Sequence, residues 1–83
     1  MAFRGFRYHR DAEEGLLALL ERGDATFSEL KRRIRRVQSE WEPEDDDDPQ
    51  LVVPFEDFFL IFTVADEDPS ILILAAVEPQ PRA

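Results

Sequence analysis

Two apolar runs joined by a short polar connector dominate the C-terminal half of this chain. The runs are residues 58–65 and 71–77, and the connector, residues 66–70, reads DEDPS. Both runs are rich in β-branched and aromatic residues and bounded by turn formers, which predicts a β-hairpin. A strand with one face in solvent alternates apolar and polar residues, whereas these runs are almost continuously apolar. We therefore expect both faces of the hairpin to be covered, one by helices and the other by another surface.

The length and composition predict one small cytoplasmic domain spanning residues 1–83. The chain has 83 residues, enough for a single modest core, and no cysteine, which excludes a disulfide framework and a thiolate metal site. Its apolar runs are far shorter than the roughly 20 residues that span a bilayer, so we expect no membrane anchor and no signal peptide.

Charge is distributed unevenly along the chain. The net charge of −9 divides into nine Arg/Lys against eight Asp/Glu in residues 1–42, and one Arg against eleven Asp/Glu in residues 43–83. An acidic protein is repelled by phosphate backbones, so nucleic-acid binding is not expected outside a local basic patch.

The first half of the chain predicts a strand followed by two helices. Phe6 and Tyr8 lie on one side of a short extended segment. Asp11 is the expected N-cap of a helix that continues to about Arg22, with Gly23 ending it in a left-handed conformation. We expect the helix to bury a stripe formed by Ala12, Leu16, Leu19 and Leu20, flanked by Leu17.

A second helix is expected to begin at Thr26, which with Glu29 forms a capping box. Its apolar residues recur at spacings of three and four, as one buried seam: Phe27, Leu30, Ile34, Val37 and Trp41. The short link predicts that the two helices form an antiparallel hairpin. The remaining face is basic and is either a solvated surface or a binding site for nucleic acid or an acidic partner: Lys31, Arg32, Arg33, Arg35 and Arg36.

Residues 43–50 predict a solvated acidic loop, because four aspartates lie between prolines. The alternate ligand spacing and the glycine of a calcium loop are absent, so no metal site is expected. A short strand follows at residues 51–55, and residues 78–83 are expected to form a flexible tail.

This order of elements predicts an α+β domain, with a helical hairpin packed on an antiparallel sheet of three to four strands. The order, the segment FRYHRDA at residues 6–12 and the segment PFEDFFLIFTVADEDPSILILAAV at residues 54–77 resemble the RelE/ParE-like toxin superfamily of bacterial toxin-antitoxin systems. The resemblance implies a toxin-like component that binds a protein partner. Ribonucleases of that superfamily carry basic residues on the sheet, and the corresponding positions here are Leu60 and Thr63.

A catalytic function therefore has only weak candidates. His9 with Arg7 and Arg10 is the one group that could serve an endoribonuclease, since a histidine titrates near neutral pH. The competing interpretation of His9 is a surface residue before a helix. A third hypothesis is an acidic inhibitor, such as a phage-borne one, that mimics nucleic acid through residues 43–57.

Protein binding without catalysis and without a cofactor is the function we expect. The uncovered face of the sheet, or the edge of its last strand, would bind an antitoxin-like partner, a target protein or a second copy of the chain. The predicted contact residues are Phe58, Leu60 and Phe62 of the hairpin, with Trp41, Arg32, Arg33, Arg35 and Arg36 of the second helix.

Overall fold

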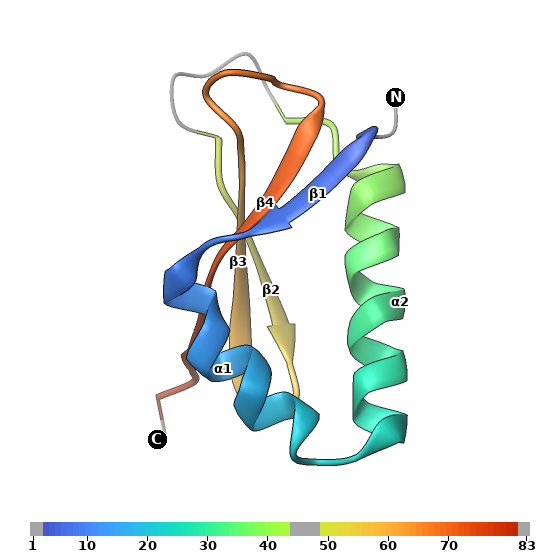
Figure 1. Ribbon diagram of the computed structural model, residues 1–83, viewed down its shortest axis with the longest axis vertical. Coiled ribbons are helices and arrows are strands. Elements are labelled where there is room, and N and C mark those ends of the chain that lie inside the picture. The colour runs from blue at the N-terminus through green and yellow to red at the C-terminus, as the bar shows by residue number, and fades with distance from the viewer. Residues whose placement is uncertain (1–2, 44–48, 82–83) are drawn as a thin grey trace.

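Four strands and two helices follow one another in the computed structural model, which describes residues 3–43 and 49–81 (Figure 1). Their order is β1, α1, α2, β2, β3, β4, and both helices pack on a four-stranded sheet. This arrangement confirms the predicted α+β class. The bounds are Gly5–Tyr8 for β1, Arg10–Leu20 for α1, Asp24–Glu40 for α2, Leu51–Phe55 for β2, Phe58–Val64 for β3 and Ile71–Pro79 for β4.

The sheet has the strand order β1-β4-β3-β2 and is mixed. The three C-terminal strands pair antiparallel, as predicted, whereas β1 pairs parallel with β4. Phe62 lies opposite Leu74 and Val64 opposite Leu72, and the register shifts between Ile61 and Phe62. The chain therefore places its first strand beside its last, which makes β1 and β2 the two edges of the sheet.

Both helices begin earlier than the sequence suggested. His9, and not Asp11, is the N-cap of α1, and its Nδ1 accepts a hydrogen bond from the Asp11 N–H at 3.1 Å. Gly23, and not Thr26, is the N-cap of α2. Gly23 has a φ of 109°, a conformation that glycine adopts without steric cost.

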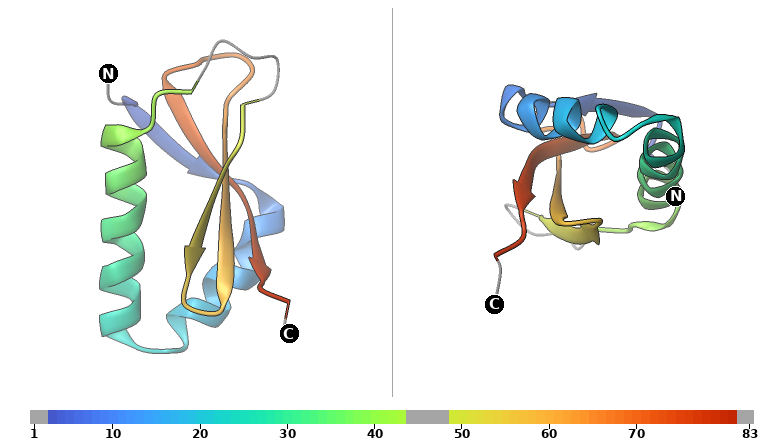
Figure 2. Two further views of the ribbon diagram at one scale, coloured as in Figure 1. Left: turned by 180° about the vertical axis from the view of Figure 1, so that it is seen from behind. Right: turned by 90° about the horizontal axis from the view of Figure 1, so that it is seen from below.

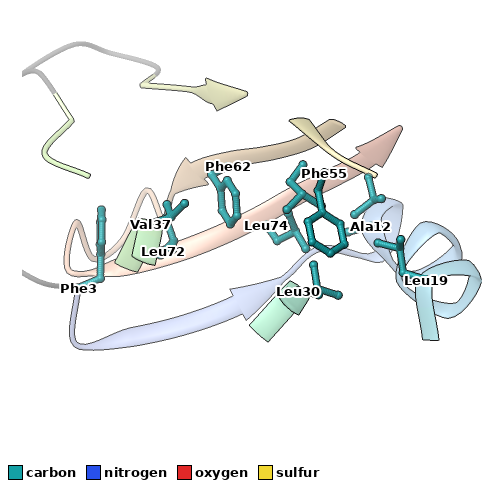
Figure 3. Close-up of a cluster of buried hydrophobic side chains, with 11 residues drawn as sticks. Phe3, Ala12, Leu19, Leu30, Val37, Phe55, Phe62, Leu72 and Leu74 are labelled. Atoms are coloured by element: carbon teal, nitrogen blue, oxygen red, sulfur yellow. The ribbon is translucent and has the colours of Figure 1, made fainter. Parts of the chain in front are cut away.

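Burial is concentrated on one face of the sheet. Leu60, Phe62, Leu72 and Leu74 have no exposed surface and belong to one hydrophobic core. Figure 3 shows Phe62, Leu72 and Leu74 together with the core residues of the helices. The helices contribute Ala12 and Leu19 from α1 and Leu30 and Val37 from α2. The Phe3 and Trp41 rings lie 5.9 Å apart, and the Phe3 N–H donates to the Gln38 carbonyl at 3.0 Å.

The end of the chain stays paired for longer than expected. The strand β4 continues through Pro79, which lies opposite Phe58. Gln80 then donates its backbone N–H to the Asp57 carbonyl and its side-chain amide to the Phe58 carbonyl, both at 2.8 Å. Pro79 and Gln80, which belong to the segment expected to form a flexible tail, are thus in contact with the β2–β3 turn and the start of β3. Most of the predicted acidic loop, residues 44–48, lies outside the described residues.

Two arginines attach the start of the chain to the β3–β4 loop. Arg4 forms an ion pair with Asp68 and also donates to the Ser70 hydroxyl at 2.6 Å. Arg7 pairs with Glu67 at 2.8 Å. Hydrogen bonds from Ser70, and then the contact with Arg4, lower the pKa of Asp68 from 3.8 to about 2.

The close packing of α1 on β4 leaves no room for a side chain at Gly15. A Cβ at Gly15 would lie 2.5 Å from the Val77 Cβ. Glycine-to-alanine changes in a helix interior normally stabilise by about 1 kcal/mol, but Gly15→Ala should lower the free energy of unfolding by about 1–3 kcal/mol through overpacking. Urea denaturation measures the change, with Glu14→Ala on the exposed side of α1 as control. A stabilised Gly15→Ala protein would contradict the packing.

The lowered pKa of Asp68 should make the stability of the folded protein sensitive to acid. Because its pKa is lowered in the folded protein, the native state binds fewer protons than the unfolded state between about pH 4 and pH 2. The stabilisation by Asp68 is present above that interval and is lost as the pH falls through it. Thermal unfolding against pH should show a shallower acid dependence for Asp68→Asn than for the wild type. Asp66→Asn, in the same loop, is the control, and equal slopes for Asp68→Asn and wild type would refute the prediction.

Candidate functional site

One face of the sheet is apolar and has no helix over it in the described part of the chain. Side chains alternate along β3, so the residues next to buried Leu60 and Phe62 point the other way. In the right-hand view of Figure 2, which looks at the molecule from below, α2 lies on one side of β3 and no helix lies on the other. We call this surface the open face; its residues are Val52, Phe59, Ile61, Thr63, Ile71 and Ile73, all half-buried or exposed.

The open face corrects the predicted contact residues of the hairpin. Leu60 and Phe62 are fully buried, so they belong to the core and have no surface for a partner. Phe58 is half-buried beneath the Arg22 guanidinium, which lies 5.1 Å from its ring centroid. The alternate residues, Phe59 and Ile61, take the place assigned to Leu60 and Phe62 from the sequence.

Cations are scarce on the open face. Thr63 donates its hydroxyl to the Pro49 carbonyl at 2.9 Å. Arg7 lies opposite Ile73 in the register and therefore belongs to this face, but its guanidinium is paired with Glu67. A backbone hydrogen bond, and then the contact with Arg7, lower the pKa of Glu67. The ion pair neutralises Arg7, which leaves the centre of the open face uncharged.

The three catalytic candidates are not gathered in a cavity. His9 is exposed. Its Nδ1 accepts a hydrogen bond from the Asp11 N–H at the start of α1 and lies 3.4 Å from an Asp11 carboxylate oxygen. Arg7 is held by Glu67, and Arg10 is exposed at the first turn of α1. None of the three lines either of the two hollows described next.

A three-sided hollow of about 460 Å³ lies between β1, α1 and α2. Buried Leu30 and Leu74 are among its lining residues. We call it the β1 hollow; Figure 1 shows the three elements between which it lies. Its lining residues are Phe6, Tyr8, Glu13, Leu16, Leu17, Leu20, Phe27, Leu30, Lys31, Ile34, Arg35, Gln38 and Leu74.

Exposed apolar side chains converge on the β1 hollow. Of the five large hydrophobic residues that are exposed in the described chain, four line it: Tyr8, Leu17, Leu20 and Phe27. Tyr8 is 56% exposed and Leu17 55%. Sequence reasoning assigned Leu20 and Phe27 to buried stripes and therefore missed this surface. Leu17, an apolar residue beside the stripe, was the signal that could have indicated it.

Four of the five basic residues of α2 divide between two hollows. Lys31 and Arg35 line the β1 hollow, and the Lys31 Nζ lies 5.1 Å from the Phe27 ring centroid. Arg33, Arg36 and Trp41 line a smaller hollow of about 280 Å³ between α2 and β2. Arg32 pairs with Glu29 at 2.6 Å and Arg36 with Glu40 at 3.2 Å. The predicted basic face is thus two small clusters, one at each flank of α2.

Comparison of this chain with protein-family models, with curated proteins and with solved structures found no match. Within the described residues, no helix is long and apolar enough to cross a membrane. The same residues contain no cluster of three or more His, Asp or Glu side chains placed to hold a metal ion.

His9 provides a direct test of its structural role. His9→Ala removes the acceptor at the N-terminus of α1 and should lower the free energy of unfolding by about 1 kcal/mol. His9→Asp keeps an acceptor at the N-cap and should restore most of that loss. Urea denaturation of both variants measures the effect. Equal losses in the two variants would exclude capping as the contribution of His9.

Proposed function

We propose that this protein acts by binding another protein, without catalysis of its own, as a toxin-like component of a toxin-antitoxin pair. The order of elements and the hairpin sequence support this proposal through their resemblance to the RelE/ParE-like toxins. The strand order β1-β4-β3-β2 brings β1 beside the C-terminal hairpin, so the two segments that carry the resemblance form one structural unit.

The apolar open face is the observation that carries the proposal. Phosphodiester cleavage develops negative charge in the transition state, which a ribonuclease stabilises with cations or hydrogen-bond donors. At the positions where the resembling ribonucleases carry arginine, Leu60 is buried and Thr63 is hydrogen-bonded to Pro49. An apolar face rimmed by polar residues is typical of a protein interface.

The alternative functions receive less support. An endoribonuclease would need His9, Arg7 and Arg10 to act together, whereas His9 caps α1 and Arg7 is paired with Glu67. The acidic-inhibitor hypothesis depends mainly on residues 44–48, which lie outside the described residues. A cytoplasmic location and self-association through the sheet remain expectations.

Two assays test this function. The purified protein, with and without ribosomes, should leave RNA intact. Co-expression with the product of a small adjacent gene should give a stable complex, which Val52→Glu on the open face should weaken and exposed Ser28→Glu on α2 should not. Isothermal titration calorimetry measures the affinities. RNA cleavage that disappears in His9→Ala would overturn the proposal in favour of the endoribonuclease.

A further inference from the structure

We propose that the β1 hollow is a docking site for an acidic amphipathic helix of a protein partner. The inference rests on the proposed function in one respect, that the protein works through contacts with another protein. It adds the location of a second surface and the chemistry of the segment that binds there.

The apolar lining supplies the first part of the argument. Tyr8, Leu17, Leu20 and Phe27 come from three different elements and expose large apolar side chains to the same hollow. Burying such side chains against another apolar surface is favourable because it removes them from water. An occupant with its own apolar side chains would therefore be stabilised here more than elsewhere on the described surface, where Val52 is the one other exposed large hydrophobic residue.

The open rim favours a protein segment over a small molecule. The hollow, at about 460 Å³, is within the range of about 300–1,000 Å³ for ligand sites. Such sites bury about 70–90% of a ligand, but Tyr8 and Leu17 are more than half exposed at this rim. A helix laid across the opening can insert apolar side chains at i, i+4 and i+7 and cover the rim with its body.

The charges at the rim of the hollow favour a partner segment with a negative charge. Lys31 and Arg35 line the hollow and form no ion pair within the described residues, whereas Glu13 is the one acidic residue in the lining. The whole chain carries a net charge of −9. An acidic segment is therefore repelled by most of the molecule and attracted at this rim, which gives it both orientation and specificity.

The edge of β1 favours a helix over an added strand. The strand β1 has only four residues, and the hydrogen bond from the Phe3 N–H to the Gln38 carbonyl attaches the segment just before it to α2. At its other end the chain turns directly into α1. A partner strand would find a short edge closed at both ends, whereas a helix needs only the side-chain cavity between the three elements.

Synthetic peptides test the inference on the full-length protein. The probe is a fluorescein-labelled helical peptide of about four turns with leucine on one face and glutamate on the other. The matched control replaces every glutamate with lysine. Fluorescence anisotropy should detect binding of the acidic peptide, weakening as salt is raised, and at least about tenfold weaker binding of the basic peptide.

Variants locate the site. Leu17→Glu, and the double variant Lys31→Glu with Arg35→Glu, should each weaken binding of the acidic peptide by about tenfold or more. Two control variants should leave binding of the acidic peptide unchanged. Val52→Glu is on the open face, and Arg32→Glu replaces an arginine that is paired with Glu29 on the same helix. Circular dichroism establishes that each variant is folded. In NMR spectra of the wild-type protein, the acidic peptide should change the backbone amide shifts of residues around the hollow only.

Three outcomes would overturn the inference: equal binding of the two peptides, loss of binding in Val52→Glu but not in Leu17→Glu, or no binding of the acidic peptide. A different result would refute the proposed function. If a protein partner binds Leu17→Glu with full affinity, the proposed function stands but the hollow is not the docking site. RNA cleavage that depends on His9 would refute the proposed function.

Discussion

The pairing of β3 with β4 is the interaction on which the rest of the structure depends. Its register places Phe62 opposite Leu74 and Val64 opposite Leu72, so the largest buried side chains of the sheet share one face. A slip by one residue would turn every one of these side chains to the other face. Both helices, and the Phe3–Trp41 contact, pack against the surface that this register creates.

The same register produces the surfaces that remain for function. A chain of 83 residues can cover only one side of its sheet, and the helices cover the side of Leu60 and Phe62. The open face stays apolar with no helix over it in the described chain. The β1 hollow lies where β1, α1 and α2 surround Leu74, and a hydrogen bond from the Phe3 N–H to the Gln38 carbonyl attaches the segment before β1 to α2.

The elements were predictable because each one has a local pattern, and the errors occur where a distant contact decides. Asp11 is the favoured N-cap by residue type, but the His9 N–H donates to the Leu74 carbonyl at 2.9 Å. That bond extends the ladder of β1 to His9 and makes His9 the residue before the helix. The parallel pairing of β1 with β4, and the anchoring of Gln80, likewise depend on residues far away in the chain.

The sequence alone determined that this is an α+β domain with an apolar hairpin and that no cation occupies the hairpin positions at Leu60 and Thr63. It could not determine which face of the hairpin is open, because Phe59 and Ile61 are as apolar as Leu60 and Phe62 and alternation therefore carries no information. Only the packing of the helices made that choice. The β1 hollow was also decided by tertiary structure, since its exposed side chains come from three elements that local patterns treat separately.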